Sequence, residues 1–115
     1  MRSGSISVPA AGRGFRRELQ ARVRPLLAGG AVLVVPTSPC EAPPLDASIL
    51  QQNTIREATM GVTAIAGLCG APEVTLPAGE VDGLPVGLSF IAASGTDRAL
   101  LGFAREVASI LQLPA

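Results

Sequence analysis

The sequence predicts an α/β fold in the order α-β-α-β-β-α, with a small mixed sheet flanked by helices. Three observations lead to this prediction. Residues 31–35 form a continuous run of apolar, mostly β-branched residues. Two further short apolar runs, at 74–76 and 86–91, are separated by Pro, Gly and acidic residues, as in two strands joined by a turn region. Apolar residues at helical spacing precede the first run and follow the last, which is the alternation that α/β proteins show.

The first helix is expected from Phe15 to Ala28, where apolar residues recur every three or four positions and Gly29-Gly30 forms the stop. Pro25 falls inside this pattern and is expected to kink the helix or end it early. Residues 1–14 are rich in Gly, Ser, Ala and Pro, and are predicted to form a loose N-terminal segment. The remainder, 15–115, then forms one small domain. The apolar positions of the helix are Phe15, Leu19, Val23, Leu26 and Leu27.

The run at 31–35 does not alternate with polar residues, so we expect a strand buried on both faces. It ends in the sequence Pro36-Thr37-Ser38-Pro39, and residues 40–45, with Pro43-Pro44, form an irregular loop.

The second helix is expected from about Ile49 to Leu68, with Asp46 or Ser48 as its cap. Its second half is nearly uncharged, which predicts a buried helix, and Gly70 suits the left-handed position after its end. Small residues that would let another backbone come close lie at Gly61, Ala64, Gly67 and Gly70.

The last helix is expected to begin at Thr96 or Asp97 and to reach about Leu113. Its apolar stripe consists of Leu100, Leu101, Ala104, Val107, Ala108 and Leu111.

The chain is very apolar for its length: of 115 residues, 48% are hydrophobic and 16% are charged. A small domain has much surface to cover, so this composition indicates part of something larger or a protomer with a large interface. A compact domain rich in Ala, Gly and Val is the alternative. No apolar stretch is long enough to span a bilayer or to form a signal peptide, and we expect a cytoplasmic protein.

The basic residues are all Arg, since the sequence contains no His and no Lys. Arg does not lose its proton at neutral pH and cannot serve as an ordinary base, so a Ser-His-Asp or Ser-Lys system cannot be built from these residues. Cys40 and Cys69 cannot close a zinc site without His, so neither a metal nor a cofactor is predicted. The five Arg between 13 and 24 form either a solvated helix face or a contact for an anionic partner; without Trp or Tyr, nucleic-acid binding is not supported.

Four segments resemble the amidase signature family, whose members hydrolyse C–N amide bonds. The stretch from Gly70 to Ile91 contains a Gly-Leu-Pro-Val-Gly-Leu motif, and 31–39 resembles the strand that enters a Pro-Thr loop. The helix before the motif matches at Thr63, Ala66, Gly67 and Gly70, and the start of the last helix matches at Gly95, Asp97, Leu100 and Leu101. These segments occur in the family's order over about 15–113, which identifies a C-terminal portion of such an enzyme.

The resemblance implies a Ser nucleophile, a bridging Ser and a Lys base, all in a region that precedes the one matched here. Since the chain has no Lys, none of its residues is assigned as catalytic. Ser38, Ser89 and Ser94 lie in strand-end or turn positions, where a structural role is expected.

By resemblance, the residues expected to line the substrate pocket are Pro36, Thr37, Ser38, Met60 and Thr63. In family members that act on charged tRNA, an Asp occupies the position of Met60. Its replacement indicates a small apolar or aryl amide as the substrate of the complete enzyme, while simple core packing is the other interpretation of Met60.

Three hypotheses for function follow. The chain is a segment of an amidase, inactive by itself, that works with a separate catalytic half. Alternatively, it is a non-catalytic interaction module that associates with a partner or with itself through exposed apolar faces. A third hypothesis, a carboxylate pair formed by Glu41 and Asp46 or by Glu80 and Asp82, competes with ordinary solvated turn residues. The sequence leaves open whether Met1 is the start of the protein.

Overall fold

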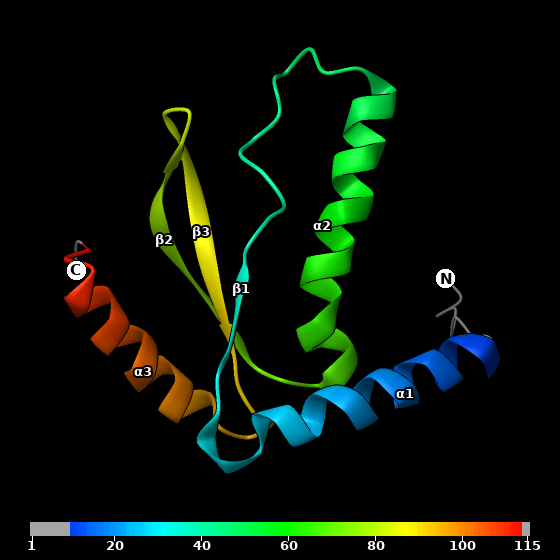
Figure 1. The fold of residues 1–115 in the computed structure, drawn as a ribbon, viewed down its shortest axis with the longest axis vertical. Coiled ribbons are helices and arrows are strands. Elements are labelled where there is room, and N and C mark those ends of the chain that lie inside the picture. Colours follow the sequence, from blue (N-terminus) through cyan, green and yellow to red (C-terminus); the bar gives the residue numbers. More distant parts are fainter. Residues whose placement is uncertain (1–9, 114–115) are drawn as a thin grey trace, which may run out of the picture.

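The computed structural model describes residues 10–113 and confirms the α/β class and the predicted order of elements (Figure 1). The bounds of the helices and strands are α1 Ala10–Leu27, β1 Leu33–Pro36, α2 Ile49–Cys69, β2 Glu73–Val81, β3 Leu84–Ile91 and α3 Asp97–Ile110, with a short 3-10 turn at Ala28–Gly30 after α1. Among these residues no helix is long and apolar enough to cross a membrane.

The sheet has the order β1-β3-β2, and both neighbouring pairs are antiparallel. The prediction of a mixed sheet is therefore wrong in this detail. The crossover through α2 makes β1 and β2 run in the same direction, but β3 lies between them and runs the opposite way. No two parallel strands are thus neighbours.

The β2–β3 pair is a longer hairpin than its apolar runs predicted. Its turn consists of Asp82 and Gly83, whose φ angles of 51° and 77° are those of the two-residue turn that Asp-Gly favours. The pairing shifts register between Pro77 and Gly79, and this irregularity lets the strands continue through a Pro-Gly segment that the sequence suggested was a loop.

Two predictions about the N-terminal half need correction. First, α1 begins at Ala10, so part of the segment expected to be loose is helical, while residues 1–9 lie outside the described range. Second, β1 is not buried on both faces: Leu33 and Val35 are half-buried, whereas Val34 is exposed. Val34 lies on the same face as its register partner Phe90, and α3 packs against this face over β2 and β3. Pro25 is accommodated inside α1, which ends two residues later.

Helix α2 begins with a capping box, in which Ser48 and Gln51 each bond the backbone N–H of the other, and ends at Gly70 in the left-handed conformation (φ 63°). The expected burial of this helix is not observed. Only Ala66 and Cys69, in its last turn, are buried. A Cβ added at Gly61 or Gly67 would meet nothing within 4 Å. Figure 1 shows why: among the described elements, α1 crosses only the lower end of α2.

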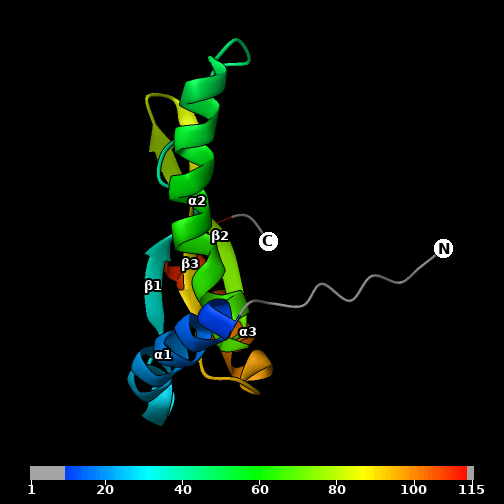
Figure 2. The ribbon, with the colours of Figure 1, turned by 90° about the vertical axis from the view of Figure 1, so that its right-hand side faces the viewer.

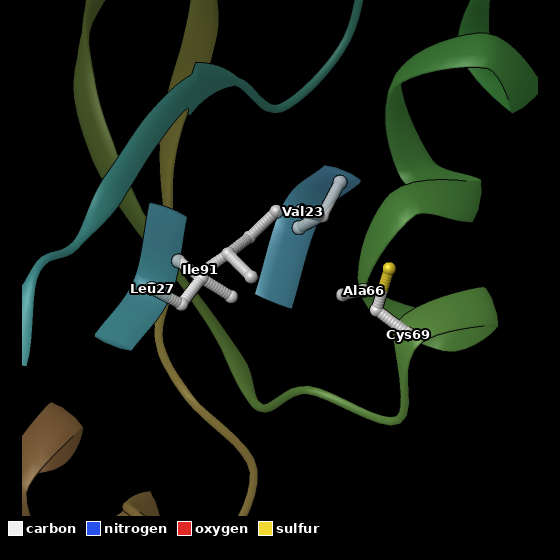
Figure 3. Close-up of a cluster of buried hydrophobic side chains, with 5 residues drawn as sticks. All are labelled: Val23, Leu27, Ala66, Cys69 and Ile91. Atoms are coloured by element: carbon white, nitrogen blue, oxygen red, sulfur yellow. The ribbon is translucent and has the colours of Figure 1, made fainter. Parts of the chain in front are cut away.

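The core consists of two clusters on opposite faces of β3. On one face Ile91 packs with residues of α1 and α2 (Figure 3). On the other face Phe90 packs with α3, and its ring meets that of Phe103 edge-on at 5.4 Å between centroids. The first cluster contains Val23, Leu27, Ala66, Cys69 and Ile91; the second contains Phe90, Ala92 and Leu100.

Helix α3 differs from its predicted stripe at two positions. Leu101 and Leu111 are exposed, while Phe103 packs against the core instead. The hydroxyl of Thr96 donates to the carbonyl of Ala93 and makes no cap bond to the helix.

Helix α1 crosses the C-terminal end of α2, as Figure 2 shows from the side, and side chains of α1 cap this end. Arg16 Nε and Gln20 Nε2 both donate to the Leu68 carbonyl, at 3.2 and 2.8 Å, and Arg24 donates to the Cys69 carbonyl at 3.4 Å. The last carbonyls of a helix have no partner within it, and positive side chains near them also favour its dipole. Spacing of four residues places the three donors on one side of α1.

We expect Gln20→Ala to lower the free energy of unfolding by about 1 kcal/mol, because it removes the shortest of these bonds. Urea unfolding followed by circular dichroism measures the change. Arg13→Ala, on the same helix and without a described hydrogen bond, is the control and should change stability by less than about 0.5 kcal/mol. Equal effects of the two substitutions would contradict the capping role.

Candidate functional site

Three hydroxyl groups form a row across the sheet at the end of β1. Ser89, on the central strand, is fully buried, and its Oγ lies 2.8 Å from Thr37 Oγ1 and 2.9 Å from Thr75 Oγ1. Ser89 faces Thr75 of β2 in the strand register, while Thr37 directly follows β1. The row therefore joins all three strands through side chains.

Gly87 makes room for this row. A Cβ at this position would lie 2.7 Å from Thr37 Oγ1, closer than real Cβ contacts, and 3.0 Å from Thr75 Cγ2, tighter than most of them. The backbone N–H of Thr37 also donates to the Gly87 carbonyl at 3.2 Å. The Gly-Leu-Pro-Val-Gly-Leu motif and the Pro-Thr segment, about 50 residues apart in the sequence, thus meet at one point.

The predicted pocket residues lie in two separate places. Pro36 is the exposed last residue of β1, and Thr37 and Ser38 follow it half-buried, with Ser38 Oγ donating to the Cys40 carbonyl at 2.7 Å. Met60 and Thr63 lie on α2 and are exposed. That these five residues together line a substrate pocket stays a prediction. The structure brings Thr37 together with Ser89 and Thr75, which sequence reasoning did not join to it.

Met60 does not pack into the core: 59% of its surface is exposed. The interpretation of Met60 as a core residue is therefore wrong for the described residues. The Met60 side chain is therefore accessible for a contact with atoms other than those of the described residues.

A surface cavity of about 430 Å³ lies beside the first half of α2. The loop at 40–47 forms one wall, and Leu50, Gln51, Thr54 and Ile55 of α2 form the other. None of the five predicted pocket residues lines it, so it is a separate feature of the surface beside α2.

Ser38, Ser89 and Ser94 each form a hydrogen bond within the chain, as structural residues do. Ser94 Oγ donates to the Gly70 carbonyl at 2.6 Å, and Ser38 and Ser89 have the partners described above. Within 10–113 no three Cys, Asp or Glu side chains are grouped so that they could hold a metal ion. Glu80 and Asp82 are exposed at the tip of the hairpin, as solvated turn residues are.

Comparison with known proteins gives consistent matches. The family model described as Amidase matches residues 3–101. Amidase 1 of Arabidopsis thaliana is 32% identical over 99 residues, which cover 86% of this chain and 23% of that protein. Indoleacetamide hydrolase of Pantoea agglomerans pv. gypsophilae is 37% identical over 75 residues, covering 65% of this chain and 16% of that protein.

The fold is also similar to that of a solved structure. The crystal structure of a glutamyl-tRNA(Gln) amidotransferase subunit from Thermotoga maritima superposes with a TM-score of 0.67 at 24% identity, over 76% of this chain and 19% of that one. The chain thus spans about a fifth of the length of the proteins it matches.

We expect Gly87→Ala to destabilise the chain by about 1–3 kcal/mol, because the added methyl group overlaps the Thr37 hydroxyl in a tightly packed place. Gly61→Ala is the matched control: its Cβ meets nothing, and replacing Gly by Ala within a helix should raise stability by about 0.5–1 kcal/mol. Thermal unfolding of both variants measures the contrast. A stabilising Gly87→Ala would contradict the close packing of Thr37 on Gly87.

Proposed function

This chain belongs to the amidase family, and we propose that it is the C-terminal segment of an amidase, which takes part in C–N bond hydrolysis only together with the rest of that fold. The rest supplies the nucleophile and the base, either from a longer form of the same protein or from a separate catalytic half. The sequence contains no Lys, so the Lys base of the family must come from that part.

The uncovered surface is the observation that carries the proposal. The chain exposes 8524 Å², whereas a closed monomer of 11.6 kDa exposes about 5800 Å². If as much as about 1600 Å² is assigned to the residues outside 10–113, the upper bound for a chain of that length, about 1100 Å² of excess remains. This exceeds the area of about 800 Å² that one partner contributes to a standard protein–protein interface.

Part of the exposed apolar surface lies along α2. Ile49 and Leu50 in its first turn and Met60 in its middle are exposed, at 78%, 76% and 59%. Its small residues would let a neighbouring backbone come close, and nothing in the described chain does so at Gly61 or Gly67. An apolar helix face of this kind favours a partner that covers it.

In the assembled enzyme this chain contributes to the substrate wall. Pro36, Thr37 and Ser38 would form one side, and Met60 and Thr63 the other. A methionine favours an apolar or aryl substrate over a charged amine. The name indoleacetamide hydrolase, carried by one relative, agrees with an aryl amide as the substrate class.

An interaction module without catalysis is the second candidate, and the same exposed face of α2 favours it. The two candidates differ in whether restoring the missing part restores hydrolysis. A cytoplasmic location stays a prediction for either, to be tested by imaging a tagged protein.

We expect the purified chain alone not to hydrolyse indoleacetamide, because it lacks a base. A chimera that carries this chain in place of the matching segment of the Pantoea hydrolase should hydrolyse it, measured as ammonia release. The control is the Pantoea enzyme with that segment deleted. Hydrolysis by the isolated chain, abolished by Ser38→Ala, would overturn the proposal. A folded but inactive chimera would favour the interaction module.

We expect Gly67→Leu to leave the isolated chain at least as stable as before, because the position faces open space and leucine is a better helix former. In the chimera the same substitution should lower the melting temperature and the activity, because a neighbouring backbone would pack there. Glu57→Leu, at another exposed position of α2, serves as the comparison. Equal melting temperatures of the Gly67→Leu and unsubstituted chimeras would show that this face stays uncovered.

A further inference from the structure

The hydroxyl row contains one more proton than the hydrogen bonds within it use. Thr37, Ser89 and Thr75 each carry one hydroxyl proton, and only two hydrogen bonds join them. Ser89 is fully buried and has these two partners, so it satisfies its proton by donating to one threonine while it accepts from the other. One threonine therefore keeps a proton to donate outward, and the other keeps free lone pairs.

Rotation of the three hydroxyls reverses this direction. When Thr75 donates to Ser89, Thr37 is free to donate; when Thr37 donates to Ser89, it still accepts through its remaining lone pairs. The end of the row at Thr37 can thus serve as a donor or as an acceptor, without movement of any heavy atom.

Of the two threonines at the ends of the row, Thr37 is better placed to bind a ligand. It is half-buried at the point where the chain leaves the sheet, held by its backbone bond to Gly87 and by Ser89. Thr75 is exposed on the outer strand β2, where water can complete its hydrogen bonds. A primary amide presents an acceptor oxygen and donor N–H groups, which are the two kinds of partner that Thr37 can bind.

We propose that the hydroxyl of Thr37 binds the amide group of the substrate, and that Ser89 is the positioning residue that holds this hydroxyl in place. The inference rests on the proposed function for its substrate. The role of Ser89, in contrast, concerns the isolated chain and can be measured there.

The first experiment measures the χ1 rotamer of Thr37 in the isolated chain by NMR three-bond couplings. Threonine has more than one accessible rotamer, so the unsubstituted chain should show a single rotamer and Ser89→Ala an average of several. Thr75→Val, which removes the other hydrogen bond of Ser89, should leave Thr37 in one rotamer. A single Thr37 rotamer in Ser89→Ala, or averaging already in the unsubstituted chain, would overturn the role of Ser89.

The second experiment measures the KM and kcat for indoleacetamide in the chimera described above. Thr37→Val should raise KM about tenfold, as expected for the loss of one substrate hydrogen bond, while kcat changes less. Thr37→Ser should restore most of the affinity, because it restores the hydroxyl. Ser89→Ala should raise KM to a smaller extent. The control is Thr59→Val, which removes a hydroxyl bonded to the Ile55 carbonyl on α2.

The outcomes separate the two proposals. An inactive unsubstituted chimera contradicts the proposed function and with it the substrate role of Thr37, while the NMR result still decides the role of Ser89. An active chimera in which Thr37→Val and Thr59→Val have equal KM values overturns the assignment of Thr37. Circular dichroism melts of each variant identify losses that come from unfolding.

Discussion

Strand β3 lies at the centre of the sheet and contributes residues to both core clusters. Its last three residues, Ser89, Phe90 and Ile91, are almost completely buried, and both other strands pair with it. Alternate side chains of β3 form the centres of the two core clusters, so each flanking helix is placed by one face of this strand. The segment after β1 is fixed in the same way, through the pairing of β1 with β3 and the bond of Thr37 to Gly87.

A single buried polar residue, Ser89, lies in this strand next to the place where the last turn of α2 packs. At its lower end the sheet presents Ile91, and there α1 and the last turn of α2 pack onto it. One step further along the same face it presents Ser89 and then Gly87. A buried hydroxyl without partners would cost about 1–3 kcal/mol, and Thr37 and Thr75 prevent this cost. A face of hydroxyls offers an apolar helix little to pack against, so cohesion between α2 and the sheet is confined to the Ile91 end.

The sequence predicted the elements that depend on local patterns: the class, the order, a cap at Asp46 or Ser48, of which the structure has Ser48, and the stop at Gly70. It did not predict properties that depend on neighbours. The run at 31–35 indicated a central strand buried on both faces, but β3 is the central strand and Val34 of β1 is exposed. The position of the tight turn could also have been predicted locally, because Asp82-Gly83 is a sequence that favours a two-residue hairpin turn. The partnership of Thr37, Ser89 and Thr75 requires the strand register, which a single sequence does not contain.

In helix α2 the sequence pattern and the observed burial disagree, and this disagreement is informative. Its uncharged second half and its small residues predicted a buried helix, yet the described chain leaves most of it exposed. Natural sequences are consistent between local pattern and global packing, so such a conflict points to packing that lies outside the described residues. The conflict is clear along α2, whereas in the two core clusters the sequence pattern and the packing agree. This distribution argues for a well-formed segment of a larger fold, and against a chain that packs poorly throughout.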